Sequence, residues 1–533
     1  MPEYLSPGVY IQEVDSGPRP IEAVGTACAA FVGFAPAGPV KHPVLVTSWT
    51  QYVENFAAID EGGRRNPHMD GSYMSYAVYG YFLNGGGRAY ITRIAPDTNG
   101  NKGGGKKKDA DKPSLEVTQL TLPSRASKSV ASLTVTPKPG ATQDVEIEIA
   151  PPSAVEGTQP DNAFTVRIRM GDIQETYENV GLGKTKGVKN VVETINQSST
   201  LVDVVENQAS GPVADRVPDT GTYVLKQQQL PAEVPNVSAN DFEGSAPDRT
   251  GVMGLEIAED VTMVCAPDIM AAYQSGAMDR DGVKAAQLAM IAHCEMMGDR
   301  VAILDPLPDL NPQEVRAWRQ IETNYDSKYA ALYYPWIKVA GTDGQPMALP
   351  PSGHMAGIWA RNDNTRGVHK APANEVITGA LEPVSGVTKG EQDTLNPIGV
   401  NCLRSFPGRG LRVWGARTLS SDPAWRYINV RRLFNYVEKS IENGTQWVVF
   451  EPNDEALWAM VRRDVSAFLT GVWREGALFG STPDQAFFVK CDAEINPSDV
   501  RDRGQLFIDI GMAPVKPAEF VVFRLSQWAG GGA

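Results

Sequence analysis

The strongest constraint on the fold is a regular alternation of short apolar strands and helices that begins after Gly251. VTMVCAP (residues 261–267) and RVAILDPL (300–307) have strand composition, and a helical segment (281–299) lies between them. A further helix and a further strand follow within residues 313–339. Strands that alternate with helices of this length are typical of a largely parallel sheet covered on both faces.

Before Gly251, the composition and the predicted secondary structure of the chain change twice. Residues 21–96 show the order strand, loop, helix, strand, whereas residues 97–114 are rich in Gly and Lys and predict a linker. Strand-like segments then continue to about residue 229, and a second predicted linker covers residues 231–251. The pattern predicts a compact β-rich unit inserted into a larger fold.

The last third of the chain contains two amphipathic helical patterns and two strand patterns. One helix is predicted from a Ser-Asp-Pro start to Gly444, and a second over residues 453–476. QLFIDIGMAPV (505–515) and EFVVFRLSQ (519–527) alternate like strands. The segment 341–389 shows no pattern and is predicted to be a long loop, of a length that usually has a function.

Composition excludes several classes of function. Lys plus Arg is 49 and Asp plus Glu is 63, so the net charge of −14 argues against a sequence-independent nucleic-acid binder. No apolar run approaches the ~20 residues of a spanning helix, and no membrane insertion is expected. The five cysteines are widely spaced and are predicted to be reduced, buried thiols rather than disulfides or zinc ligands.

Catalytic motifs are absent from the sequence. It has no GxSxG, no HExxH and no complete phosphate loop, so we expect no catalytic, cofactor-binding or metal-ligating residue. The enzymatic alternative is a site in the 341–389 segment built from His354, Asp363 and His369.

A cluster of arginines follows this segment. We interpret it as a basic surface that pairs with an acidic neighbouring protein rather than as a nucleic-acid groove. Its members are Arg404, Arg409, Arg412, Arg417, Arg426, Arg431 and Arg432.

Several stretches resemble the tail sheath proteins of contractile phage tails and related contractile injection systems. The most specific are LRSFPGRGLRVWGARTLSSDPAWRYINVRRLFNYVEKSIENGTQWVVFEPND and AFFVKCDAEINPSDVRDRGQLFIDIGMAPVKPAEFVVFRLSQ. YLSPGVYIQEVDSGPRPIEAVGTACAAFVGFAPAGP, FLNGGGRAYITRI, FTVRIRMGDIQETYENV and VETINQSSTLVDVV resemble the family's arm, first strands and inserted β domain.

The resemblance implies a mixed α/β fold: a central α/β sheath domain of subtilisin-like topology, an inserted β-rich domain, and an α+β C-terminal sheath domain with extended terminal arms. The implied boundaries are 1–20 for the N-terminal arm, 21–96 for the first part of the core, 97–250 for the outer inserted domain, 251–418 for the α/β domain and 419–533 for the C-terminal domain. Subtilisin-like describes topology alone, and no enzymatic activity is implied.

A strand pattern lies near each end of the chain, GVYIQEV (8–14) and EFVVFRLSQ (519–527), and each is too short to form a core of its own. Added to a neighbour's sheet, they would gain backbone hydrogen bonds; the alternative is pairing within their own chain. The resemblance favours arms that join neighbouring subunits, with the arm residues Val9, Tyr10, Ile11, Val14, Phe520, Val521, Val522, Phe523, Arg524 and Leu525. Arg462, Arg463 and Asp464 are the candidate contact with a tube or a neighbouring subunit.

The resemblance thus implies a sheath subunit that polymerises around an inner tube in an extended metastable state and contracts to drive the tube through a target envelope. Its partners would be copies of itself, the inner tube protein, and baseplate and tail-terminator or cap proteins, with no cofactor and no nucleic acid. It would assemble in the cytoplasm as a component of a phage tail or tail-like particle. The alternatives are the soluble enzyme described above and a non-contracting structural tube protein.

Overall fold

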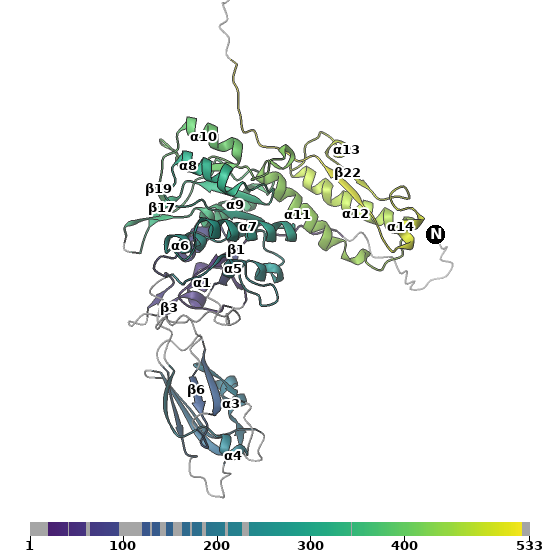
Figure 1. Cartoon of the computed structure of the whole chain (residues 1–533). Coiled ribbons are helices and arrows are strands. Elements are labelled where there is room, and N and C mark those ends of the chain that lie inside the picture. Colours follow the sequence, from purple (N-terminus) through teal and green to yellow (C-terminus); the bar gives the residue numbers. More distant parts are fainter. Residues whose placement is uncertain are drawn as a thin grey trace, which may run out of the picture.

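The computed structural model describes residues 20–40, 42–59, 64–94, 120–127, 130–138, 145–152, 162–170, 173–183, 188–207, 212–225, 234–342 and 344–524. Three hydrophobic clusters divide these residues into a central unit, an inserted unit and a C-terminal unit (Figure 1).

The central unit is built on an eight-stranded sheet of order β2-β5-β1-β14-β15-β16-β20-β21. Its strands are β1 (Cys28–Gly33), β2 (Val44–Val46), β5 (Arg88–Arg93), β14 (Met263–Cys265), β15 (Val301–Leu304), β16 (Ala330–Tyr334), β20 (Val400–Phe406) and β21 (Gly410–Val413). Only the edge strands β2 and β21 run antiparallel to their neighbours. Every residue of β1, β14, β15 and β16 is buried, so both faces are covered, and the predicted parallel sheet is confirmed.

Helices cover this sheet where the sequence provides their start and stop signals. They are α1 (Trp49–Phe56), α2 (Met74–Leu83), α5 (Ala239–Glu243), α6 (Asp268–Gln274), α7 (Arg280–Met297), α8 (Pro312–Ala317), which continues into a π-helical turn (Trp318–Thr323), α9 (Ser352–Arg366) and α10 (Lys389–Leu395). Asp279 caps the start of α7 by accepting from the backbone N–H of Gly282, and Gly298 ends the helix at φ +71°.

The prediction of a long loop over residues 341–389 is wrong. This segment contains β18 (Pro346–Leu349), the 15-residue helix α9 and β19 (Ala380–Pro383), and both strands pair with β17 (Ile337–Ala340). A Cβ on Gly353 would lie 2.5 Å from the carbonyl oxygen of Ala77 in α2, so small residues are needed there. Because α9 is buried on most sides and packs through glycines, it lacks the apolar stripe that marks a surface helix.

The inserted unit has its own core between two sheets, whose strand pairs are antiparallel except for the short parallel pair β10–β11. One sheet consists of β8 (Val145–Ala150), β9 (Ala163–Met170), β10 (Ile173–Gly181), β11 (Lys189–Asn190) and β13 (Gly221–Leu225), and the other of β6 (Leu120–Pro123), β7 (Ala131–Pro137) and β12 (Val202–Glu206). Helices α3 (Val191–Ser198) and α4 (Val213–Arg216) complete it. The predicted linker 231–251 is partly structured, because Phe242 of α5 is buried in the central core.

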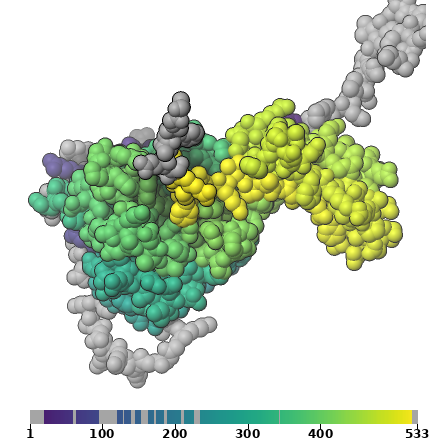
Figure 2. All heavy atoms as spheres, turned by 90° about the horizontal axis from the view of Figure 1, so that it is seen from above, coloured from purple at the N-terminus to yellow at the C-terminus, as the bar shows by residue number. Residues whose placement is uncertain are grey.

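The C-terminal unit projects sideways from the central unit (Figure 2). It contains α11 (Ile428–Gly444), α12 (Glu455–Arg474), α13 (Pro483–Ala486), α14 (Ser498–Asp502) and the two-stranded sheet of β22 (Phe487–Lys490) and β23 (Asp509–Met512). Both predicted helices are present. Among the apolar residues of α12, Leu457 and Val465 are buried, whereas Met460 is 38% exposed.

Candidate functional site

The carboxyl edge of the central sheet is the usual place for a ligand in an open α/β fold, at the point where the strand order reverses. Here the order reverses at β1, between β5 and β14. The carboxylate of Asp268, just after β14, accepts hydrogen bonds from the backbone N–H groups of Phe34 (2.6 Å), Tyr73 (2.5 Å) and Met74 (3.2 Å). It therefore links the end of β1 to the start of α2 at this edge of the sheet. A Cβ on Gly33 would lie 2.5 Å from this carboxylate.

A second buried carboxylate lies after the next strand. Asp305 follows β15 and accepts from the backbone N–H (2.9 Å) and the hydroxyl (2.6 Å) of Ser352, at the start of α9. Burial raises the pKa of Asp268 to about 6 and that of Asp305 to about 7. Both carboxyl groups are thus used to hold helix starts in place.

Replacing Asp305 by asparagine is expected to change how stability depends on pH. Because its folded pKa lies above the ordinary value of 3.8, the contribution of Asp305 to stability is present in acid and is lost as the pH rises through about 7. Each pKa unit corresponds to about 1.4 kcal/mol. The melting temperature of Asp305→Asn relative to the unmodified protein should therefore rise between pH 5 and pH 8. The exposed Asp393→Asn serves as control, and parallel pH profiles for Asp305→Asn and the unmodified protein would contradict the assignment.

The three residues of the enzymatic alternative do not form a site. Asp363 is held by Arg432 through two hydrogen bonds of 2.8 and 2.5 Å, with both side chains 3% exposed. His354 is buried inside α9 against Gly80, and burial lowers its pKa to about 4. His369 is half-buried beyond the end of α9, and burial lowers its pKa as well. In the described residues, no hydrogen bond joins these three side chains.

Six of the seven arginines in the predicted cluster divide into two groups, and the seventh, Arg426, is half-buried. Arg417, Arg431 and Arg432 are buried and form ion pairs with Glu519, Glu438 and Asp363 respectively. The arginines of the β20–β21 hairpin are bonded to neutral acceptors instead.

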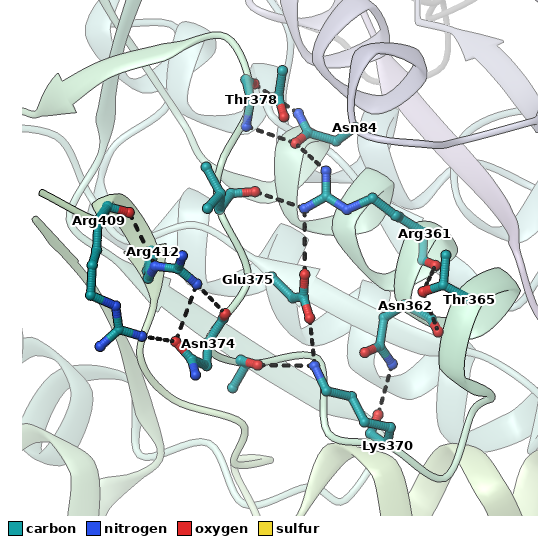
Figure 3. Close-up of polar contacts among 12 residues, drawn as sticks. Asn84, Arg361, Asn362, Thr365, Lys370, Asn374, Glu375, Thr378, Arg409 and Arg412 are labelled. Carbon is teal, nitrogen blue, oxygen red and sulfur yellow. Dashed lines mark hydrogen bonds and ion pairs between the residues drawn. The ribbon is translucent and has the colours of Figure 1, made fainter. Parts of the chain in front are cut away.

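In the hairpin, Arg409 donates to the side-chain oxygen of Asn374 (3.0 Å) and Arg412 to its carbonyl (2.7 Å). Arg404 donates to the amide oxygen of Gln392 (2.9 Å). Figure 3 shows that the nearby carboxylate of Glu375 is already shared by Arg361 and Lys370, at 3.8 and 2.6 Å. Within the described part of the chain, none of the three hairpin arginines has an ion pair.

The C-terminal segment is held to the central unit at one acidic residue that the sequence analysis missed. The carboxylate of Glu519 accepts from Arg417 (2.9 and 2.7 Å), the hydroxyl of Tyr427 (2.9 Å) and the amide of Asn396 (2.7 Å). These hydrogen bonds hold the pKa of Glu519 below its usual range, although burial opposes them. Asn429 also donates to the carbonyl of Val515. The chain is therefore anchored up to Glu519.

The segment predicted as the C-terminal arm is exposed directly after this anchor. Phe520, Val521, Val522 and Phe523 are 72%, 68%, 79% and 82% exposed, and Arg524 is exposed as well. Residues 520–524 lie outside every strand of the described chain. Leu525 and the N-terminal arm residues Val9, Tyr10, Ile11 and Val14 fall outside the described residues.

The predicted tube-contact residues lie in α12 with different surroundings. Arg462 donates to the carbonyl of Cys491, and Asp464 is 5% exposed and paired with Arg463 at 2.9 Å. The side chain of Arg463 is 55% exposed, so it is the one of the three that offers a substantial surface.

The described residues contain no cluster of His, Cys, Asp or Glu side chains suited to a metal ion. None of their helices has the length and apolar character needed to cross a membrane. A cavity of about 370 Å³ lies at the amino ends of β1 and β14, and its charged lining includes the Arg88–Asp260 ion pair. All five cysteines are buried free thiols, as predicted.

Comparison with known proteins gives a consistent result. Residues 258–419 match the family described as "Phage tail sheath protein central domain", and residues 420–527 match "Phage tail sheath C-terminal domain". The tail sheath protein of Vibrio phage KVP40 is 30% identical over 180 residues, covering 33% of this chain and 26% of the relative. A putative prophage major tail sheath protein of Pseudomonas aeruginosa is 28% identical over 237 residues, covering 43% and 58%. The chain therefore spans less than two thirds of the length of either relative.

A solved structure extends the likeness to nearly the whole chain. The helical sheath of the anti-feeding prophage in its contracted state is 24% identical, with a TM-score of 0.55 over 98% of this chain and 99% of that chain. At this level of identity the likeness establishes the fold, which is that of proteins from contractile assemblies.

Proposed function

The chain belongs to the phage tail sheath family, and we propose on this basis that it is the subunit of a contractile sheath. Copies of the chain stack around an inner tube in an extended, metastable state and contract to drive the tube through a target envelope. The protein works as a component of a phage tail or tail-like particle that is assembled in the cytoplasm, and it has no catalytic role. The observation that carries this proposal is the match of both sheath domains, in order, along residues 258–527.

Strand addition between subunits is supported by surfaces of the C-terminal unit. The β22–β23 sheet has two strands, and the described residues place no third strand on its edges. An open edge accepts an added strand. The exposed apolar residues 520–523 are suited to such pairing, and residues 9–14 have the same strand pattern. We therefore assign both termini as arms that pair with neighbouring subunits.

Contraction requires rigid units that move and segments that stay connected. Pro514 and Pro517 precede the predicted C-terminal arm and lie in a stretch held by Asn429 and Glu519. We place the bending point of the C-terminal arm after Glu519. The buried Arg432–Asp363 pair joins α11 to α9, so the central and C-terminal units move as one body.

The exposed face of α12 is the proposed contact with the inner tube. Arg463→Glu is expected to weaken assembly on tubes, because it reverses the exposed charge of this face. Lys189→Glu, an exposed charge reversal in the inserted unit, is the control. Co-sedimentation with preformed tubes measures the effect. Equal binding of both variants and the unmodified protein would show that the tube is contacted elsewhere.

The proposed function itself is tested by contraction. Sheaths assembled with tube and baseplate partners should shorten and widen when triggered, as seen by electron microscopy of particles before and after triggering. Cylinders of one fixed length and width under every condition would instead support a non-contracting tube protein.

A further inference from the structure

We propose that the β20–β21 hairpin of one subunit binds the turn at residues 449–455 of a neighbouring subunit. Each copy of the chain carries both the basic hairpin and the acidic turn, so the contact can repeat from copy to copy. This inference rests on the proposed function, because it assigns one contact of the sheath polymer.

The basic face is the hairpin of Arg404, Arg409 and Arg412. All three guanidinium groups have neutral hydrogen-bond partners, although the chain as a whole carries a net charge of −14. The guanidinium carbon of Arg404 lies 5.4 Å from the centre of the Phe406 ring, and that of Arg409 lies 6.0 Å from the Trp414 ring. The face thus combines planar cations with aromatic surface and suits a partner that is both acidic and apolar.

The turn between α11 and α12 presents an aromatic side chain in an unfavourable backbone conformation. Phe450 is fully exposed and has a φ of +70°, and its neighbour Val449 is 64% exposed. A bulky L-residue at this φ costs about 1–2 kcal/mol. Backbone hydrogen bonds from Val449 to Gln446 and from Glu451 to Val448 hold the turn. Since Phe450 is fully exposed in the subunit, the strain is explained if its ring is buried by another molecule.

Carboxylates surround this aromatic tip. Glu451, Asp454 and Glu455 are all exposed, and none of them has an ion pair among the residues that the structure describes. The side chain of Asp454 accepts the backbone N–H of Leu457, as the cap of α12. Three uncompensated negative charges around Phe450 complement the three uncompensated positive charges around Phe406 and Trp414.

The location of the two faces favours contact between copies. The hairpin is the edge of the central sheet, whereas the turn belongs to the C-terminal unit. Two different, complementary surfaces on one chain generate a head-to-tail contact that repeats along a ring or helix. A second copy of this chain is therefore the partner that fits both faces.

A mixing experiment tests the contact. Arg409→Glu/Arg412→Glu has two acidic faces, and Glu451→Arg/Glu455→Arg has two basic faces, so each variant alone should need a concentration at least about tenfold higher to polymerise. A mixture of the two should polymerise near the concentration of the unmodified protein, because opposite charges then meet at every contact. Arg125→Glu/Lys189→Glu, on exposed residues of the inserted unit, is the charge-matched control and should assemble normally.

A single substitution gives an independent readout. Phe450→Gly removes the strained conformation, so its melting temperature should be unchanged or higher, while its assembly should weaken.

Normal assembly of both charge-reversed variants, or folded variants that fail to polymerise even when mixed, would overturn the proposed contact. Either result counts against the contact only when the unmodified protein polymerises in the same experiment. Failure of the unmodified protein to polymerise would instead contradict the proposed function.

Discussion

Replacing Arg432 by methionine is expected to destabilise the folded subunit by about 3–5 kcal/mol, because it leaves the carboxylate of Asp363 buried without its partner. Arg432 also donates to the carbonyl of Thr26 (2.9 Å), and its guanidinium carbon lies 4.9 Å from the ring of Trp359. One side chain thus joins α11, α9 and the segment before β1. Hydrogen exchange should show faster opening of α9 and α11, together with a lower melting temperature.

The matched control breaks an exposed ion pair. Lys490→Met removes the partner of Glu494, which is 78% exposed, so its melting temperature should stay close to that of the unmodified protein. The double variant Arg432→Met/Asp363→Asn should recover part of the loss, since no unpaired charge remains. Equal effects of Arg432→Met and Lys490→Met would contradict the view that the buried pair holds the two units together.

Replacing the four apolar residues 520–523 by serine is expected to abolish polymerisation and to leave the subunit fold intact. These side chains are at least 68% exposed, so the isolated subunit gains little from them. Burial in a neighbouring sheet would contribute about 1.5–3 kcal/mol for each fully buried side chain, before the cost of ordering the arm. The melting temperature and the sedimentation of assembled particles measure the two effects separately.

A substitution at Glu519, which anchors the chain just before these residues, should give an intermediate loss of assembly. Glu519→Gln keeps the arm but weakens its bonds to Arg417, so assembly should be reduced rather than lost. The substitution of two exposed apolar residues elsewhere, Ile321→Ser/Leu381→Ser, should leave assembly unchanged. Full polymerisation by the four-serine variant would refute the role of this arm.

Secondary structure could be predicted from sequence wherever a segment had a regular pattern and a clear boundary. The fully apolar strand β1 and the helix α7, with Asp279 at its start and Gly298 at its end, are examples. Helix α9 could not be recognised, because its glycines pack against α2 and burial on most sides removes the polar face.

The residues that determine the candidate site were harder to find. Asp268 and Asp305 each follow a buried strand closely, which is a usable signal, but their backbone partners are distant in sequence. The arginine cluster was visible as a whole. Its division into buried pairs such as Arg432–Asp363 and the open hairpin depends on tertiary packing.

Negative-stain electron microscopy of the purified full chain, beside a variant lacking residues 1–20, tests the central claim most directly. We predict wide hollow cylinders from the full chain and folded, soluble monomers from the variant. Compact particles from both proteins, with no polymer even when tube and baseplate partners are supplied, would contradict assembly into a sheath.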